Sequence, residues 1–438
     1  MSTLAVLALR GGCTVTGSDR NESEAVERLR EKGIDIKIGH DEKNVEGADA
    51  VIFTAALDGA NPELAAAKKA GIPLISRGEY LGYLMSSYKN RIGVSGTHGK
   101  TTTTSMISHI FIDAGLDPTV ANGAILPEIG GAYRVGSNEN FVYEACEYKD
   151  SFLSFCPTDA VITNVELDHT DYFRSLDHMV ASFGKAIENA SRVFVNKDCE
   201  KALEALKDYK GEVVTVSLKD KSADFSACAV VYTHGMPEYT LCHRGDQLCR
   251  VSLRLIGEFN LYNSLCAAAV AFSFGIGPEL IAKSLSTFTG AARRFEHKAT
   301  INGIAVYDDY AHHPSECFST LNAVKALGYK NVYCVFQPHT YSRTHDLLQG
   351  FELVFSEAAK NGINMIFAKI YAAREVDTMG VSSDLLAGDI GALSFDSFDK
   401  IADYLAKKAK PGDLVLTMGA GDVYKVGEKL IEKLKLNN

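Results

Sequence analysis

The stretch GVSGTHGKTTTTSMISHIF, from Gly93 to Phe111, constrains the fold of this chain more than any other. An apolar run enters it, a glycine turn follows, and a lysine with four threonines opens a helical apolar pattern. A strict phosphate-binding loop reads GxxxxGK[ST], and here Val94 stands where its first glycine would be. The other features still predict a strand, a phosphate-binding turn and a helix. The residues predicted to bind the nucleotide are Gly96, Thr97, His98, Gly99, Lys100, Thr101 and Thr102.

Two side chains of this loop have expected roles. Lys100 would supply a positive charge to the phosphates, and Thr101 would offer its hydroxyl to Mg²⁺. The alternative is a glycine turn that only caps a helix. The combination of strand, glycine, lysine and threonine favours the nucleotide site over that alternative.

Composition and charge narrow the class of protein. The 438 residues predict two or three domains, and the net charge of -10 argues against a nucleic-acid or anionic-membrane partner. The 10 cysteines contain no CxxC pair, which favours a reduced, cytoplasmic location. No apolar run approaches the ~20 residues of a membrane span, and no basic segment precedes the apolar start, so we expect neither membrane insertion nor a signal peptide.

Strand-like and helical segments alternate along the chain and restart twice, which predicts α/β domains with parallel sheets. A polar break at 86–90 precedes the loop, and the pattern restarts after TFTGAARRF. We therefore expect three domains, at 1–89, 90–292 and 293–438. Short strand-like runs at 229–234, 238–243 and 247–255 predict an accessory antiparallel hairpin layer in the second domain.

Polar side chains follow two apolar strand runs of the second segment. Glu144 ends one run, where it could hold Mg²⁺ or orient a nucleophile, although a solvated strand end is the alternative. Another strand run ends with carboxylate and amide side chains beside a histidine. Such a set suits a divalent cation, and a loop with acidic caps is the alternative. Its members are Asn164, Glu166, Asp168, His169 and Asp171.

Four further stretches carry candidate site residues. Asn260 and Asn263 could read an adenine edge or cap a helix. The arginine pair in GAARRFEH could reach a γ-phosphate or form a surface ion pair. In VYDDYAHHPSE a zinc site is possible, but no other His/Cys cluster at metal spacing completes it, so contacts with substrate or ribose are preferred. FQPHTYSRTHD offers His339, Arg343 and His345 to a carboxylate.

Eight stretches occur in one order: GTHGKTTT, EACE with SFL, TNxExDHxDYF, GEFNxxN, RRFE, DDYAHHP, QPHxYSRT and GAGD. Together they resemble the Mur ligases of bacterial cell-wall synthesis, over nearly the whole chain. DDYAHHP and QPHTYSRT resemble the branch of that family that joins L-alanine to UDP-N-acetylmuramate. The resemblance implies an ATP-dependent amide ligase that forms an acyl phosphate and uses two Mg²⁺ ions. It also implies a Rossmann-like UDP-sugar domain, a central P-loop ATPase domain and a Rossmann-like C-terminal domain.

The resemblance also implies roles for individual residues. Lys100 would hold the ATP phosphates, Thr101 and Glu144 one Mg²⁺, and His169 the second. Arg294 would meet the γ-phosphate. The residues left would face the other ligands: Asn260 and Asn263 the adenine, Asp309 the ribose, and His312 and Arg343 the alanine.

Three departures from the family pattern carry expectations of their own. Phe183 stands where some relatives have a carbamylated lysine, with Lys185 nearby, and Thr340 stands where some have arginine. The first strand and its glycine-rich loop precede the point where this chain begins, so Ser18 and Asp19 are the uridine-side candidates and UDP-sugar binding is expected to be weak.

Two alternatives to an L-alanine-adding ligase stay open at this point. One is a ligase that recycles a murein peptide onto the same sugar. The other is a nucleotide-binding protein whose ligase activity is impaired. Either a monomer or a homodimer is compatible with the sequence.

Overall fold

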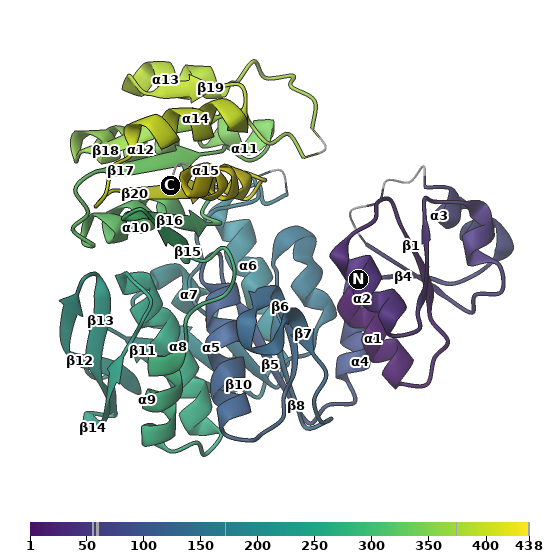
Figure 1. The fold of residues 1–438 in the computed structure, drawn as a ribbon. Helices are drawn as coiled ribbons and strands as arrows, with labels where there is room; N and C mark the ends of the chain where they lie inside the picture. Colours follow the sequence, from purple (N-terminus) through teal and green to yellow (C-terminus); the bar gives the residue numbers. More distant parts are fainter. Residues whose placement is uncertain (55–56, 58–60, 171, 374, 437–438) are drawn as a thin grey trace.

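The computed structural model describes residues 1–54, 57, 61–170, 172–373 and 375–436. The described chain forms three α/β parts in sequence order, and the first and third parts each lie against the second (Figure 1). No helix in the described ranges is both long and apolar enough to cross a membrane.

The first part is small. Its described strands form parallel pairs, β1 with β2 and β3 with β4, and helices lie between them as the alternating pattern predicts. Apolar residues of α1 and α4 pack into the core of the second part, so these helices join the two. The elements are α1 (Ser2–Arg10), β1 (Thr16–Asp19), α2 (Glu24–Glu31), β2 (Asp35–Ile38), η1 (Glu42–Val45), β3 (Val51–Phe53), α3 (Pro62–Ala70), β4 (Leu74–Ser76) and α4 (Arg77–Met85).

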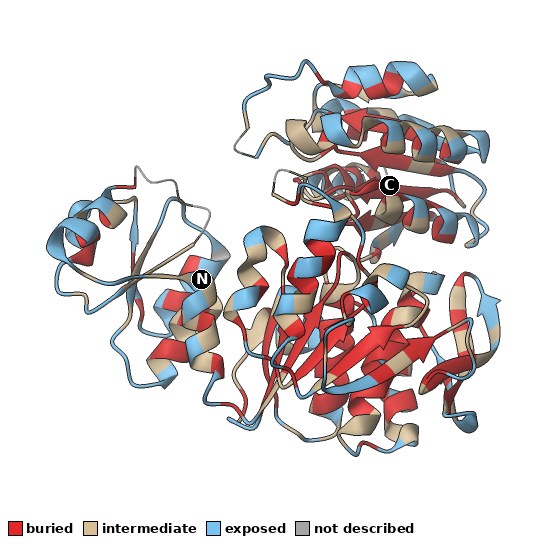
Figure 2. Ribbon diagram, turned by 180° about the vertical axis from the view of Figure 1, so that it is seen from behind, coloured by how far each residue is buried: buried red, intermediate tan, exposed pale blue. Residues whose placement is uncertain are grey.

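The second part is built on one long sheet with the strand order β14-β13-β12-β11-β10-β9-β5-β8-β6-β7 over the described residues. Its central strands are parallel and buried, and they appear red in Figure 2. The strands are β5 (Asn90–Ser95), β6 (Thr119–Leu126), β7 (Gly131–Arg134), β8 (Asn140–Glu144), β9 (Asp159–Ile162), β10 (Arg192–Asn196), β11 (Glu212–Ser217), β12 (Phe225–Thr233), β13 (Met236–His243) and β14 (Asp246–Ser252).

Helices cover both faces of this sheet. One apolar cluster includes residues of α5, α8 and α9, and another includes residues of η3 and α6. The predicted accessory hairpin layer is wrong in one respect: β12 pairs with β11, so the hairpin strands extend the same sheet. The helices are α5 (Lys100–Asp113), η2 (Pro127–Ile129), η3 (Tyr148–Ser154), α6 (Leu176–Ile187), α7 (Glu200–Glu204), α8 (Glu258–Ser273) and α9 (Pro278–Thr287).

The third part has the strand order β15-β16-β20-β17-β18-β19 over the described residues. The last strand of the chain, β20, lies between β16 and β17 and is parallel to both. The elements are β15 (Glu296–Ile301), β16 (Ile304–Asp309), α10 (Pro314–Lys325), β17 (Val332–Phe336), α11 (Tyr341–Asp346), α12 (Leu348–Lys360), β18 (Ile363–Ala368), α13 (Ser383–Ile390), β19 (Leu393–Phe395), α14 (Phe398–Lys408), β20 (Leu414–Met418) and α15 (Tyr424–Leu436).

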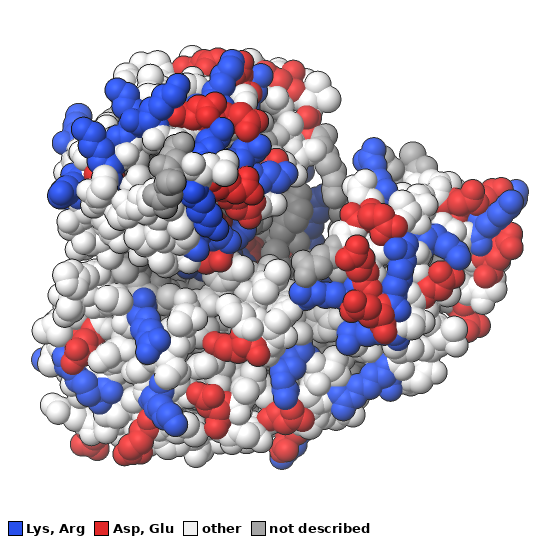
Figure 3. Space-filling view, in the orientation of Figure 1, with Lys and Arg blue, Asp and Glu red and all other residues white. Residues whose placement is uncertain are grey.

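The surface is hollowed where the parts meet (Figure 3). On the face shown, basic and acidic side chains are interspersed. Loops that follow β5 and β9 of the second part face the start of α10 and α11 of the third, and side chains bond across this junction. Carboxyl ends of parallel strands are where α/β proteins bind ligands, so the candidate site lies among these residues.

Candidate functional site

The phosphate-type loop has the backbone shape that its glycines predict. Gly96 and Gly99 have φ values of 136° and 82°, which side chains rarely tolerate. A Cβ at Gly96 would collide with Thr163, and one at Gly99 would collide with Asn263. Helix α5 begins directly after Gly99, and a glycine has no side chain with which to cap it. Its first N–H groups therefore form an anion-binding end.

Lys100 lies under this loop in a closely fitted ion pair. Its Nζ donates to the carbonyl oxygens of Gly96 and Thr97 at 2.7 and 3.0 Å and lies 2.9 Å from Glu147 Oε2. The Glu147 side chain is 0% exposed. Burial alone would lower the pKa of Lys100, but the surrounding negative groups, with the Glu147 charge foremost, together outweigh burial and raise that pKa. Lys100 is therefore held charged beneath the anion-binding end.

Thr101, Glu144 and Arg294 meet beside the loop. The Thr101 hydroxyl donates to Glu144 Oε2 at 2.7 Å, and Arg294 Nη2 donates to Thr101 Oγ1 at 3.1 Å. Glu144 also accepts the Gly123 N–H at 3.0 Å. The structure thus brings together three predicted site residues from the second and third parts. Two hard oxygen donors side by side fit the chemistry of Mg²⁺.

His169 and Arg343, predicted from distant motifs, are also in contact. Arg343 Nη2 donates to His169 Nδ1 at 3.3 Å and to Asp168 Oδ1 at 3.2 Å. His169 Nε2 faces Glu147 Oε1 at 3.6 Å, and His169 has a φ of 52°, in the left-handed region. Burial would raise the pKa of Asp168, but Arg343 and His169 lower it, so the carboxylate stays ionised. The arrangement holds the His169 ring between a guanidinium and a buried carboxylate.

His312 lies in the loop between β16 and α10 of the third part, near Arg343 and Asp168. Its Nδ1 lies 2.9 Å from the Tyr310 carbonyl oxygen, which can only accept, so Nδ1 carries the hydrogen. Burial lowers the pKa of His312 to about 4, although the nearby Glu316 charge opposes this. His312 is therefore a neutral imidazole, and among the described residues its Nε2 lone pair accepts no hydrogen bond.

The side chains of Asn260, Asn263 and Asp309, predicted to contact the nucleotide, are buried and hydrogen-bonded within the protein. Asn260 Nδ2 donates to the Ile256 carbonyl at 2.9 Å, and its Oδ1 accepts from Asn263 at 3.1 Å. Gly257 is the N-cap of α8, so neither asparagine caps that helix and the capping alternative is wrong. Asp309 accepts the N–H groups of Phe295 and Ala311, each at 2.7 Å, and burial raises its pKa to about 7.

Comparison with known proteins bears on what this junction is for. Residues 94–271 match the Mur ligase middle domain, residues 1–89 match the Mur ligase family, catalytic domain, and residues 293–421 match the Mur ligase, glutamate ligase domain. The chain belongs to the Mur ligase family. The sequence-based recognition of that family is confirmed, as is its α/β fold class.

Individual relatives of this Mur ligase are similar over nearly their whole length. The UDP-N-acetylmuramate--L-alanine ligase of Clostridium novyi (strain NT) is 43% identical over 441 residues, which cover 99% of this chain and 95% of the relative. That of Acetivibrio thermocellus is 44% identical, with 99% and 93% covered. The crystal structure of the UDP-N-acetylmuramate-alanine ligase from Thermotoga maritima superposes with a TM-score of 0.84 at 26% identity, covering 100% of this chain and 97% of that one.

The first part of this Mur ligase contains the remaining candidates. Ser18 Oγ donates to Glu63 Oε2 at 2.8 Å and lies 3.2 Å from His40 Nδ1, while Asn44 donates to Glu63 Oε1 at 2.7 Å. Asp19 is exposed and accepts the Asn21 N–H at 3.1 Å. Ser18 therefore belongs to a partly buried polar network, and Asp19 is the freer of the two.

Sequence reasoning misses one residue of the junction, Glu147, and predicts a different partner for Glu166. Glu147 lies in the same EACE stretch as Glu144, and its contact with Lys100 is the signal that identifies it. Glu166 is predicted among possible cation ligands, but its carboxylate turns to His98 at 3.5 Å. Asp171, from that same group, lies outside the described residues.

The other predicted positions have plain structural settings. Thr97 Oγ1 donates to the Glu166 carbonyl at 2.9 Å, and Thr102 is buried in α5. Phe183, at the position of the relatives' lysine, is buried and its ring centroid lies 5.2 Å from that of Phe152. A core phenylalanine cannot serve as a metal-bridging group.

Proposed function

We infer that this chain is an ATP-dependent ligase that joins L-alanine to the lactyl carboxylate of UDP-N-acetylmuramate, through an acyl phosphate, in peptidoglycan precursor synthesis. The observation that carries this inference is the identity of 43% and 44% to two UDP-N-acetylmuramate--L-alanine ligases over nearly complete chains. The junction at the carboxyl ends of the strands supports it, because cations and anion-binding backbone groups meet there.

The first step is a phosphoryl transfer. The substrate carboxylate oxygen attacks the γ-phosphorus, the bond to the bridging oxygen breaks, and ADP leaves. We propose that the start of α5 and Lys100 hold the phosphates and that Arg294 neutralises charge on the transferred group. Such a reaction depends mainly on positioning and on positive charge, and this site offers both.

Magnesium is the cofactor that the donor set fits. We propose that Thr101 and Glu144 hold one Mg²⁺ and that His169, with Glu147 beside it, holds a second. Glu147 Oε2 is buried without a hydrogen bond among the described residues, so it has capacity for a ligand besides its ion pair with Lys100. Bound Mg²⁺ would neutralise the charge that develops on the phosphate oxygens.

The second step forms the amide. The alanine nitrogen attacks the acyl carbon, the nitrogen loses a proton, and inorganic phosphate leaves with the former carbon–oxygen bonding pair. We propose that Arg343 takes the alanine carboxylate and that His312 Nε2 accepts an N–H of the amine. A group with a pKa of about 4 is a weak base, so His312 would orient the amine rather than remove its proton.

Three further ligand assignments belong to the same proposal. Asn260 and Asn263 face the adenine, Asp309 the ribose, and Ser18 and Asp19 the uridine side. The three parts are proposed as domains at 1–89, 90–292 and 293–438. A monomer or a homodimer stays a prediction.

The test measures phosphate release from ATP by the full chain. Release is expected only when UDP-N-acetylmuramate and L-alanine are both present, and glycine and L-serine are run as competing amino acids. Release with the murein tripeptide alone would favour the recycling ligase instead. If nucleotide binds but neither acceptor produces release, the protein binds nucleotide without ligase activity.

A further inference from the structure

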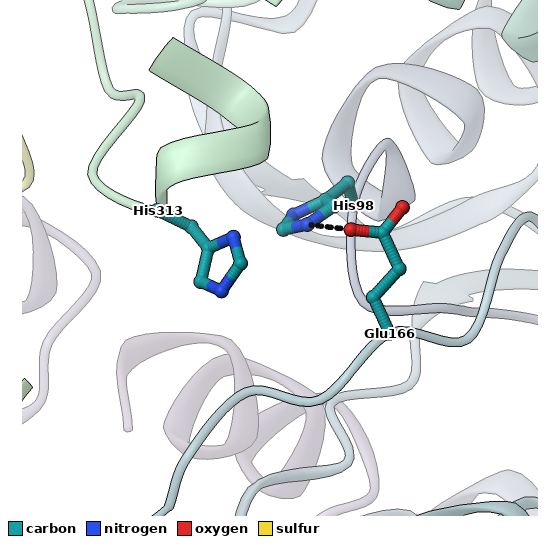
Figure 4. A group of neighbouring side chains, drawn as sticks. All are labelled: His98, Glu166 and His313. Atoms are coloured by element: carbon teal, nitrogen blue, oxygen red, sulfur yellow. Dashed lines mark ion pairs between the residues drawn. The ribbon is translucent and has the colours of Figure 1, made fainter. Parts of the chain in front are cut away.

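His98 of the phosphate loop makes contacts that the proposed mechanism does not use. Its ring points away from the loop and toward the first turn of α10 in the third part, beside His313 and Glu166 (Figure 4). Nδ1 lies 3.0 Å from Glu316 Oε1 and Nε2 lies 2.9 Å from Ser315 Oγ. Both ring nitrogens thus have partners on α10. These partners lie 218 and 217 residues further along the chain than His98.

The backbone of the same residue is fixed to the second part. The His98 N–H donates to Asn164 Oδ1 at 2.9 Å, and its carbonyl accepts from Thr163 Oγ1 at 2.6 Å and from Asn164 Nδ2 at 3.0 Å. His98 is therefore anchored in one part of the molecule and bonded through its side chain to another. A change at the loop can reach α10 through this residue.

Glu316 connects His98 to the turn that carries His312 and His313, the turn on the proposed alanine side of the site. Its second oxygen, Oε2, accepts the backbone N–H groups of His312 and His313 at 3.0 and 3.2 Å. One carboxylate thus bonds the His98 ring with one oxygen and fixes the His312–His313 backbone with the other. This is the capping box of α10, so the helix start and the link to the loop share one side chain.

The charges of the contact favour an imidazolium at His98. Burial alone would lower its pKa, but the Glu316 and Glu166 carboxylates outweigh burial and raise it to about 9. His98 then donates from both nitrogens, and its hydrogen bond to Glu316 joins an ionised donor to an ionised acceptor. Ser315 Oγ lies 2.8 Å from His313 Nδ1 and 2.9 Å from His98 Nε2. Both of these ring nitrogens therefore already have the Ser315 hydroxyl as a hydrogen-bond partner. The His98, Glu166 and His313 group is better explained as a hydrogen-bonded contact than as a metal centre.

We propose that His98 is a positioning residue that couples the phosphate loop to the alanine side of the site, through Glu316 and the His312–His313 turn. The proposal rests on the proposed function, because it takes L-alanine to be the ligand beside His312. Its consequence is that the His98 side chain sets the affinity for the amino acid without holding the nucleotide.

The first test is His98→Gln in the full chain, assayed by phosphate release. The KM for L-alanine should rise roughly 10–100-fold, the range expected for loss of one charge-assisted hydrogen bond. The ADP dissociation constant without other substrates should change less than about twofold, since the loop backbone is untouched. His297→Gln is the matched control, because His297 is exposed, its ring hydrogen-bonds its near neighbour Thr300, and its ring packs on Tyr307 within the third part.

The second test is a double-mutant cycle. Glu316→Gln should raise the same KM, and the double variant should be no worse than the poorer single variant, because both changes break one link. An unchanged KM for L-alanine in His98→Gln would overturn the proposal. So would parallel loss of ADP affinity, or a drop in melting temperature and kcat with KM unchanged. Absence of alanine-dependent release in the unsubstituted protein would refute the proposed function instead.

A pH profile adds a readout that a merely structural role would not move. The groups facing the contact are Glu166 after β9, Glu316, His312 and His313 at α10, with Asp168 and Arg294 beyond them. A raised histidine pKa means that the charged contact is present below about pH 9 and lost above it. The ratio of KM values, His98→Gln over unsubstituted, cancels the ionisation of alanine. It should fall toward one above pH 9, and a flat ratio would contradict the coupling.

Discussion

At the scale of single residues, the Lys100–Glu147 ion pair should affect both phosphate release and the free energy of unfolding. Both side chains lie beneath the loop, and the carboxylate is 0% exposed. Removing one member of a buried ion pair leaves the other charge unpaired, at a cost of about 3–5 kcal/mol. Lys100→Met should therefore abolish phosphate release and also lower the free energy of unfolding by about that amount, measured by denaturant titration.

The double variant Lys100→Met/Glu147→Gln separates the two effects. It removes both charges, so the free energy of unfolding should recover most of what the single variant loses, while phosphate release stays absent. Recovery of turnover in the double variant would mean that Lys100 only neutralises Glu147 and does not act on the phosphates.

At the scale of elements, the start of α5 depends on how closely it approaches α8. Gly99 has a φ of 82°, and a Cβ there would collide with the Asn263 amide oxygen. Alanine at position 99 would strain the backbone at this φ, and its Cβ would prevent the close approach to Asn263. In Gly99→Ala the ADP affinity should therefore fall more than tenfold, and tenfold corresponds to about 1.4 kcal/mol of binding free energy. Calorimetric titration with ADP measures this loss.

Gly115→Ala is the matched control at the other end of the same helix. Gly115 has a φ of 71°, but a Cβ added there would meet no atom of the described residues within 4 Å beyond its own chain neighbours. It should cost about 1–2 kcal/mol of stability from the backbone alone and leave ADP affinity unchanged. Equal loss of ADP affinity in both variants would show that backbone strain at either end of α5, not crowding at Asn263, disrupts the site.

The elements also explain which features the sequence could predict. Glu144 and His169 follow buried parallel strands, whose carboxyl ends meet at one sheet edge, so their proximity to the loop was predictable. The placement of β20 between β16 and β17 was not, because chain order does not fix strand order. The His98–Glu316 contact joins residues 218 positions apart, and no local periodicity encodes such a pair. Glu147 was within reach of sequence reasoning, but only its packing against Lys100 distinguishes it from a solvated acid.

At the scale of the whole molecule, the three parts have unequal cores. The apolar cluster formed by β2 and α2 has Val26, Leu29, Ile34 and Ile36 as its buried residues, whereas the clusters around the long sheet and the third part's sheet are much larger. Side-chain bonds from the first part to the second include Arg28 to the Gly130 carbonyl at 2.6 Å and Arg10 to the Gly136 carbonyl. Small cores bury too little apolar surface for high stability, so this part should unfold first.

Scanning calorimetry of the full chain should therefore resolve two transitions, the lower one belonging to the first part. Amide hydrogen exchange should agree, with faster exchange in α2 and β2 than in β5 and α8. A ligand at about 100 times its dissociation constant stabilises its own unit by about 2.7 kcal/mol. UDP-N-acetylmuramate should thus raise the lower transition most and ADP the upper one. A single transition that both ligands raise equally would mean that the parts unfold together, with α1 and α4 joining the small core to the large one.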